Sequence, residues 1–158
     1  MPKSPEDLLE PDAAKVARPV LRGEGCSNIS LLPDWIIDNF LNVREAVDLL
    51  DTLSADGIAV SIITYMEVYE GTLRAQATQE LRDACTRFFA NANVLAFTPA
   101  VARRCATLRQ ELRRQGKRVN SRALDLCIAA TALEHNLEFV SNNRADYDDI
   151  PGLTLYRY

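Results

Sequence analysis

The sequence predicts one α/β domain, in which a mostly parallel sheet is flanked by helices. Between residues 28 and 158, short apolar runs alternate with patterns of helical spacing, and this alternation is typical of parallel strands joined by helices. A chain of 158 residues is long enough to bury one substantial core. The apolar fraction of 47% and the charged fraction of 25% are those of an ordinary globular domain.

The expected elements follow from apolar patterning and from residues that begin or end helices. Pro33 ends the first apolar run, and Asp34 can cap a helix that begins at Trp35. Pro99 suits an early helical position, and Gly116 suits the end of the same helix. The expected strands are residues 29–32, 57–62, 94–97, 139–140 and 153–156. Helices are expected from Trp35, over 43–50, and at 64–75, 78–91, 99–115 and 122–135.

Residues 1–27 are expected to form a leader or a disordered arm, with the domain spanning residues 28–158. The arm is rich in proline and glycine and has no sustained period. It also lacks the continuous apolar stretch of a secretory signal. No apolar run approaches the roughly 20 residues that cross a bilayer, so we expect a cytoplasmic protein with no membrane partner.

Cysteine and histidine are placed unfavourably for several kinds of site. The four cysteines are far apart in sequence, and His135 is the single histidine. A zinc site would need closely spaced ligands, so we expect reduced, mostly buried thiols. Histidine-dependent hydrolases and histidine-based ribonucleases are also disfavoured, which leaves acid–base chemistry to carboxylates or to a metal.

Asp125 is the least expected acid in the chain, because it lies in an apolar helical segment, residues 123–133. A buried carboxylate costs several kcal/mol unless it has a partner or a metal. The alternative is an acid in the first turns of a helix, stabilised by the helix dipole, with Ser121 as the cap. We favour a functional role for Asp125.

Glu67 has two interpretations that the sequence does not separate. Thr64 and Glu67 have the spacing of a capping box, in which the glutamate bonds back to the amide of the cap. Alternatively, Glu67 belongs to an acidic site, because it follows a predicted strand. Glu70, one turn further on, is expected to be a solvated neighbour.

Several polar side chains follow predicted strands and should meet at one edge of the sheet. Asp34, residues 63–67 and residues 142–143 all come just after a strand, and ligands of such sheets bind at the carboxyl ends of the strands. Asn143 and Asp146 lie in a polar loop that is either a surface turn or a second part of this site. Carboxylates without histidine suit Mg²⁺ or Mn²⁺, whose bound waters can attack a phosphodiester.

Charge is distributed unevenly along the chain. The net charge of −4 argues against nucleic-acid binding by the whole surface. One stretch is nevertheless basic, and it is either a solvated helix face or a surface for a phosphate backbone. Its members are Arg103, Arg104, Arg109, Arg113, Arg114, Lys117, Arg118 and Arg122.

From about Asp34 to Tyr158, the chain resembles PIN-domain ribonucleases, specifically the VapC-type toxins of bacterial toxin–antitoxin pairs. The resemblance rests on an ordered set of segments: residues 35–38, 61–71, 108–116, 124–133, 142–143 and 150–153. It implies a parallel sheet between helices, a homodimer, and a cleft that a cognate antitoxin blocks. It also implies three or four acids that bind Mg²⁺ or Mn²⁺ and cleave RNA.

Position by position, Glu67 and Asp125 match the family's second and third acids, and Asn143 lies near the place of the fourth. The first acid departs from the pattern. The segment Trp35-Ile36-Ile37-Asp38 sets a register in which Leu32 stands where the family has its first Asp, and Asp34 matches a supporting position. A register slipped by two residues would make Asp34 the ligand itself.

The sequence therefore predicts a metal-dependent endoribonuclease of the toxin type. Its expected catalytic residues are Asp34, Glu67, Asp125 and Asn143, and its expected metal ligands are Asp34, Glu67, Asp125 and Asp146. Its expected RNA-binding residues are Arg113, Arg114, Arg118 and Arg122. The first alternative is a catalytically impaired binding module that keeps the partner surface but lacks the first acid. The second is a nuclease of the same fold that acts on DNA.

Overall fold

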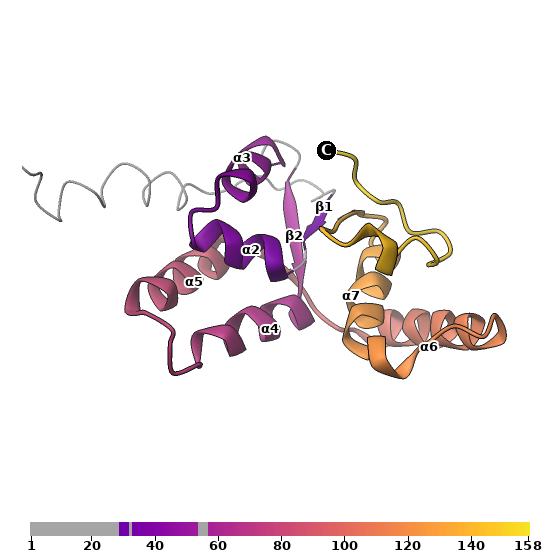
Figure 1. Ribbon diagram of the computed structural model, residues 1–158. Helices are drawn as coiled ribbons and strands as arrows, with labels where there is room; N and C mark the ends of the chain where they lie inside the picture. The colour runs from indigo at the N-terminus through magenta and orange to yellow at the C-terminus, as the bar shows by residue number, and fades with distance from the viewer. Residues whose placement is uncertain (1–28, 32, 54–56) are drawn as a thin grey trace, which may run out of the picture.

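The computed structural model describes residues 29–31, 33–53 and 57–158. The predicted arm (residues 1–27), Cys26 and Leu32 lie outside these ranges, so the predictions about them stay predictions. The described elements, drawn in Figure 1, alternate between strands and helices as the sequence predicts. In chain order they are β1 (Ile29–Leu31), α2 (Pro33–Phe40), α3 (Arg44–Leu53), β2 (Ile58–Ser61), α4 (Ile62–Thr72), α5 (Gln79–Asn91), β3 (Asn93–Leu95), α6 (Pro99–Arg114), α7 (Ala123–Glu134) and β4 (Glu138–Val140).

The described strands form one sheet in the order β3-β2-β1-β4, with every neighbouring pair parallel. The predicted fold class is therefore confirmed. The strand expected at 153–156 is reduced to a single bridge between Phe139 and Leu155. Two backbone hydrogen bonds hold it: the Phe139 amide donates to the Thr154 carbonyl (2.8 Å), and the Tyr156 amide donates to the Phe139 carbonyl (2.9 Å).

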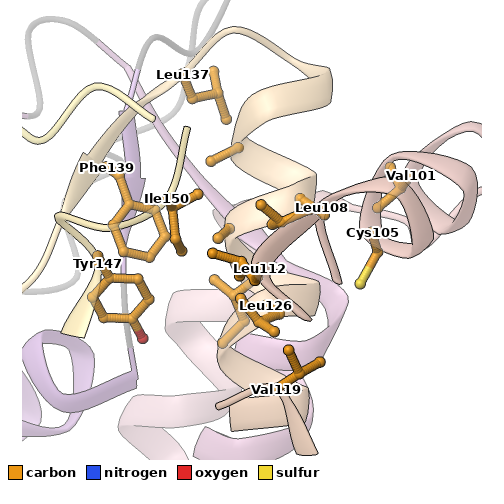
Figure 2. Close-up of a cluster of buried hydrophobic side chains, with 14 of the residues drawn as sticks. Val101, Cys105, Leu108, Leu112, Val119, Leu126, Leu137, Phe139, Tyr147 and Ile150 are labelled. Atoms are coloured by element: carbon orange, nitrogen blue, oxygen red, sulfur yellow. The ribbon is translucent and has the colours of Figure 1, made fainter. Parts of the chain in front are cut away.

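Helices cover both faces of the sheet, and each face has its own core. Figure 1 shows α2, α3 and α5 on one side and α6 and α7 on the other. Along β2, Ile58 and Val60 pack into the core beneath α2 and α3, which we call the first core. Ala59 packs into the second core, beneath α6 and α7, because successive side chains of a strand point to opposite faces. Figure 2 shows the second core, where side chains of α6 and α7 meet Phe139 and Ile150.

Three predicted helix caps are wrong, and each correction bears on an acidic residue. The first helix begins at Pro33 rather than Trp35, which places Asp34 in its first turn instead of at the cap. The cap of α4 is Ser61, whose Oγ accepts a hydrogen bond from the Thr64 amide at 2.9 Å. Before α7, Ser121 lies in a 3₁₀ turn (Asn120–Arg122) and makes no cap; the N-cap position is Arg122.

Thr64 is thus already inside α4, and Glu67 lies beyond the first turn, where no capping box can form. The predicted end of α6 is confirmed. Gly116 has a φ of +70°, and the Lys117 amide donates to the Leu112 carbonyl at 2.9 Å, which closes the helix as a left-handed cap does. Among the described residues, no helix is both long enough and apolar enough to cross a membrane.

Candidate acidic site

The strand order has a switch point beside β1. β1 lies between β2 and β4, and the chain reaches β4 only after β3 has been placed on the far side of β2. The order therefore reverses beside β1, and ligands of parallel sheets bind beyond the carboxyl ends of the strands at such a point. Asp34 follows β1, α4 follows β2, and the loop of residues 141–147 follows β4.

Asp34, Glu67 and Asp125 lie in one electrostatic neighbourhood, although they come from three different helices. Burial raises the pKa of Glu67, and the negative charges of Asp125, Asp34 and Glu70 raise this pKa further. Glu67 and Asp125 are half-buried and Asp34 is exposed. Because the capping box does not form, helix capping does not explain why an acid stands at position 67. Repulsion between Glu67 and the neighbouring acids lowers the stability of the fold.

Asp125 has the partner that its apolar surroundings require. The Tyr147 hydroxyl donates a hydrogen bond to Oδ1 of Asp125 at 3.1 Å. Burial raises the pKa of Tyr147, as do the charges of Asp125 and Asp146, so this hydroxyl keeps its proton and stays a donor. The ring of Tyr147 packs beside Phe139, with 4.7 Å between the ring centroids (Figure 2). The hydrogen bond fixes the carboxylate while leaving its second oxygen available.

Asn143 and Asp146 form an exposed pair beside these acids. Nδ2 of Asn143 donates to Oδ2 of Asp146 at 2.5 Å, and the Asn143 amide donates to the Ser141 hydroxyl at 3.1 Å. The charge of Asp146 contributes to the raised pKa of Tyr147, which places Asp146 within electrostatic reach of the Asp125 environment. Both residues are exposed at the rim of the acidic neighbourhood.

Arg122 anchors the loop that carries these groups. Its guanidinium donates to both carboxylate oxygens of Asp149, at 2.9 and 3.0 Å, and also to the Asp146 carbonyl. The pair is mostly buried and lowers the pKa of Asp149. The charges of Asp125 and Asp146 help to raise the pKa of Arg122, so one positive charge lies next to the acidic neighbourhood.

Two of the other basic residues have side-chain partners. Arg104 pairs with Glu134 at 3.0 Å, and Arg109 donates to Asn120 at 3.4 Å. Arg113, Arg114 and Arg118 are exposed, the first two in the last turn of α6. In Figure 1, α6 projects to one side of the domain, and the chain returns from its end to the start of α7.

The donor set is chemically suited to a hard divalent cation. Carboxylate oxygens are the ligands that Mg²⁺ and Mn²⁺ prefer, and the repulsion that raises the pKa of Glu67 is of the kind that a bound cation would relieve. As the side chains stand in the described part of the chain, no three Asp, Glu, His or Cys residues converge closely enough to hold one ion. The residues fit a metal by their chemistry and their shared neighbourhood.

Two parts of this site could not be found by sequence reasoning. Tyr147 ends the polar loop. The sequence distinguishes it only as an aromatic residue three positions before the apolar Ile150. The Arg122–Asp149 pair joins residues 27 positions apart and has no local signature. Of the described cysteines, Cys85 and Cys105 are buried, Cys127 is half-buried, and all three are free, which confirms the prediction of reduced thiols for this part of the chain.

Known proteins share this fold and part of this sequence. The sequence pattern of the PIN domain matches residues 35–153. The chain is 29% identical over 112 residues to the tRNA(fMet)-specific endonuclease VapC of Shigella flexneri, covering 71% of this chain and 80% of that protein.

Solved structures give the same result. The toxin–antitoxin complex from Klebsiella pneumoniae contains a chain that is 30% identical, with a TM-score of 0.59 and coverage of 82% of this chain and 99% of that one. DNA-bound VapBC from Salmonella typhimurium matches at 26% identity and a TM-score of 0.72, over 82% and 96% of the two chains. VapBC2 from Rickettsia felis, bound to a promoter fragment, has 22% identity and a TM-score of 0.73, over 82% and 98%, and supports the fold. This chain therefore belongs to the PIN-domain family, as a homologue of the VapC toxins.

Proposed function

We propose that this protein is a metal-dependent endoribonuclease, the toxin of a toxin–antitoxin pair. The observation that carries the proposal is the shared neighbourhood of Asp34, Glu67 and Asp125 at the carboxyl edge of a parallel sheet, in a homologue of an RNA-cutting endonuclease. The half-burial of Glu67 and its repulsion from Asp125, Asp34 and Glu70 oppose stability, and strain of this kind concentrates at functional sites.

Asp34, Glu67 and Asp125 would hold the ion, with Asp146 as a further ligand and Asn143 beside it. A bound Mg²⁺ or Mn²⁺ would supply an activated water and charge stabilisation for the phosphate. Tyr147 positions Asp125 through its hydrogen bond, and such supporting contacts hold ligands in place. Asn143 and Asp146 are both exposed, so this pair would be open to an incoming substrate.

RNA would be held by the exposed arginines at the end of α6 and in the loop that follows, Arg113, Arg114 and Arg118. Their guanidinium groups suit phosphate oxygens, which accept paired hydrogen bonds. We leave Arg122 out of this set, because both of its terminal nitrogens already donate to Asp149 or to the Asp146 carbonyl. Its proposed role is to fix the loop beside the acidic site.

A cleavage assay tests the proposal. Matched RNA and DNA oligonucleotides and the tRNA(fMet) named for the Shigella flexneri relative are incubated with Mg²⁺, with Mn²⁺ and with EDTA. We expect metal-dependent cuts in RNA alone, and loss of cleavage in Asp125→Asn. Glu138→Gln removes an exposed carboxylate from β4 and should cleave as the wild type does. Cleavage that survives EDTA, or that proceeds equally on DNA, would contradict the proposal.

An antitoxin is the proposed protein partner, because relatives of this chain were solved as VapBC and toxin–antitoxin complexes. A groove of about 270 Å³ between α2, α4 and α5 offers it a mainly apolar seat, lined by Ile37, Phe40, Val68 and Leu81 with Arg74 at its side. Phe40→Asp should weaken antitoxin binding without altering cleavage. A variant that binds antitoxin normally would place the contact elsewhere.

A homodimer is also proposed. Four exposed apolar side chains lie at helical spacing along α4 and its C-cap: Ile62, Met66, Tyr69 and Leu73, which are 38%, 43%, 49% and 67% exposed. A continuous apolar stripe of this kind marks an interaction surface. Met66→Glu should shift the protein to monomer in sedimentation experiments, and an unchanged mass would refute the assignment of this stripe.

The second candidate, a catalytically impaired binding module, rests on Leu32. This residue stands where the resemblance places the first acid, and Leu cannot bind a cation. If the candidate is right, wild-type protein binds antitoxin but cuts RNA poorly, and Leu32→Asp with Pro33→Thr raises cleavage at least tenfold, or about 1.4 kcal/mol of barrier. If Asp34 is the true ligand, the wild type is already active and Asp34→Ala abolishes the activity.

A further inference from the structure

Outside the acidic site, α6 and α7 bring two thiols together. Sγ of Cys105 lies 3.9 Å from Sγ of Cys127, although 22 positions separate the residues. Both thiols are free. A disulfide has an S–S length of about 2.05 Å, which leaves roughly 1.9 Å to be closed by side-chain rotation. The third described cysteine, Cys85, lies in the opposite core, on the other side of the sheet.

The pair opens onto a groove. A cavity of about 490 Å³ is lined by Cys105 and Cys127 together with Phe97, Arg109 and Arg113. Cys105 is 4% exposed, whereas Cys127 is half-buried, so a reagent in the groove reaches Cys127 more easily. Figure 2 shows Cys105 on α6 beside Val101, at the edge of the second core.

The charge of the groove favours an anionic reagent. Arg109 and Arg113 contribute two positive charges to its lining, and no acidic residue belongs to that lining. Arg109 is close enough to Cys105 for its charge to act on that thiol. Burial raises the pKa of Cys105 to about 11, so Cys105 is protonated at neutral pH and is suited to the second step of an exchange rather than the first.

We propose that Cys105 and Cys127 form an oxidation site, which a small anionic disulfide of the glutathione type converts to an intramolecular disulfide between α6 and α7. In the first step, Cys127 loses its proton and attacks one sulfur of the reagent, forming a mixed disulfide and releasing one thiol. In the second, Cys105 loses its proton and attacks Sγ of Cys127, releasing the second thiol. Two protein thiols are oxidised, and one reagent disulfide is reduced to two thiols.

The thiol pair is independent of the proposed nuclease activity and is tested without it. Full-length protein is incubated with glutathione disulfide, alkylated, digested and mapped by mass spectrometry. We expect a Cys105–Cys127 link that dithiothreitol removes. A link between any other pair, or both thiols remaining free, would overturn the proposal.

Two single variants test the order of the steps. Cys105→Ala lacks the second thiol and should accumulate glutathione on Cys127. Cys127→Ala should leave Cys105 unmodified, because Cys105 is almost fully buried. The wild-type map stands even if either variant folds poorly. Glutathione found on Cys105 but not on Cys127 would reverse the order and refute this part of the proposal.

A charge test addresses the arginines. Arg109→Gln with Arg113→Gln should slow the reaction with glutathione disulfide on the order of tenfold at low salt, because attraction of an anion is lost. The reaction with neutral hydroxyethyl disulfide should keep its wild-type rate. Equal slowing with both reagents would show that the arginines shape the groove and do not select anions.

Discussion

The hydrogen bond from Tyr147 to Asp125 gives the sharpest prediction about the site. Tyr147→Phe removes one hydroxyl and keeps the ring that packs beside Phe139. A hydrogen bond to a charged group contributes about 1.5–3 kcal/mol. Asp125 is half-buried, so water can replace part of the bond and the lower end of that range applies. We expect a loss of about 1.5 kcal/mol in the free energy of unfolding, which lowers the Tm of a chain of this size by roughly 3–6 °C.

The same substitution should reduce function by more than its effect on stability. Removing the partner that orients a metal ligand typically costs about 10–100-fold in metal affinity or activity. We therefore expect metal-dependent RNA cleavage to fall at least tenfold at limiting Mn²⁺, and to recover in part when Mn²⁺ is raised.

The assays are thermal unfolding in EDTA and single-turnover cleavage across a Mn²⁺ titration. Tyr65→Phe is the matched control, because it also removes one hydroxyl from a partly buried ring that packs beside a phenylalanine, with 4.5 Å between the ring centroids of Tyr65 and Phe89. A double-mutant cycle with Asp125→Asn isolates the pair. If Tyr147→Phe lowers the Tm but leaves cleavage and its metal dependence unchanged, the hydrogen bond is structural only and the reasoning about Asp125 is refuted.

Three further predictions concern neighbouring charges. The folded-state pKa of Glu67 lies above its ordinary value near 4.5, so ionised Glu67 destabilises the fold above the folded-state pKa, and the penalty disappears as pH falls below 4.5. Glu67→Gln should accordingly raise the Tm in EDTA at pH 7.5, give no gain at pH 4, and abolish cleavage. A lower Tm at pH 7.5 would show that other interactions of ionised Glu67 outweigh the cost of its burial and repulsion. Arg122→Lys keeps the charge but loses the two-pronged bond to Asp149, so it should cost about 1–2 kcal/mol in urea unfolding, and unchanged stability would mean that the pair does not anchor the loop. Arg113→Gln with Arg114→Gln should weaken RNA binding and reduce the slope of log affinity against log salt by about 0.7 for each lost phosphate contact, whereas an unchanged slope would move the RNA surface elsewhere.

Local pattern was sufficient for the fold class, and it is also the basis on which the acids were chosen. The alternation of short apolar runs with helical stripes predicts the parallel sheet, and Asp125 stands out because its helix is otherwise apolar. In the structure, the charges of Asp34 and Asp125 act on Glu67 and raise its pKa. This agrees with the expectation that these three acids lie near one another. Their roles as metal ligands stay a prediction.

What the sequence left open depends on tertiary contacts. Ser61 and Thr64 can each cap a helix, and the end of β2 decides that Ser61 does so. Tyr147 and Asp125 are 22 positions apart, and Arg122 and Asp149 are 27 apart. No periodicity links such positions, because their proximity is created by the packing of α7 against β4 and the loop after it. Arg122 was predicted to bind RNA because it belongs to the basic stretch that ends at that residue, and its ion pair with Asp149 has no local signature.

The central claim is that the acids form one metal site. The measurement that tests it most directly is Mn²⁺ binding by the full-length protein, measured by calorimetry and by thermal unfolding. If Asp34, Glu67 and Asp125 share one ion, the wild type binds Mn²⁺ at a single site and gains about 2.7 kcal/mol of stability at a hundredfold excess over the Kd. Asp34→Asn, Glu67→Gln and Asp125→Asn each weaken binding at least tenfold, and Glu138→Gln does not. Equal stability of the wild type with and without Mn²⁺, or unchanged binding by Asp125→Asn, would contradict a shared metal site.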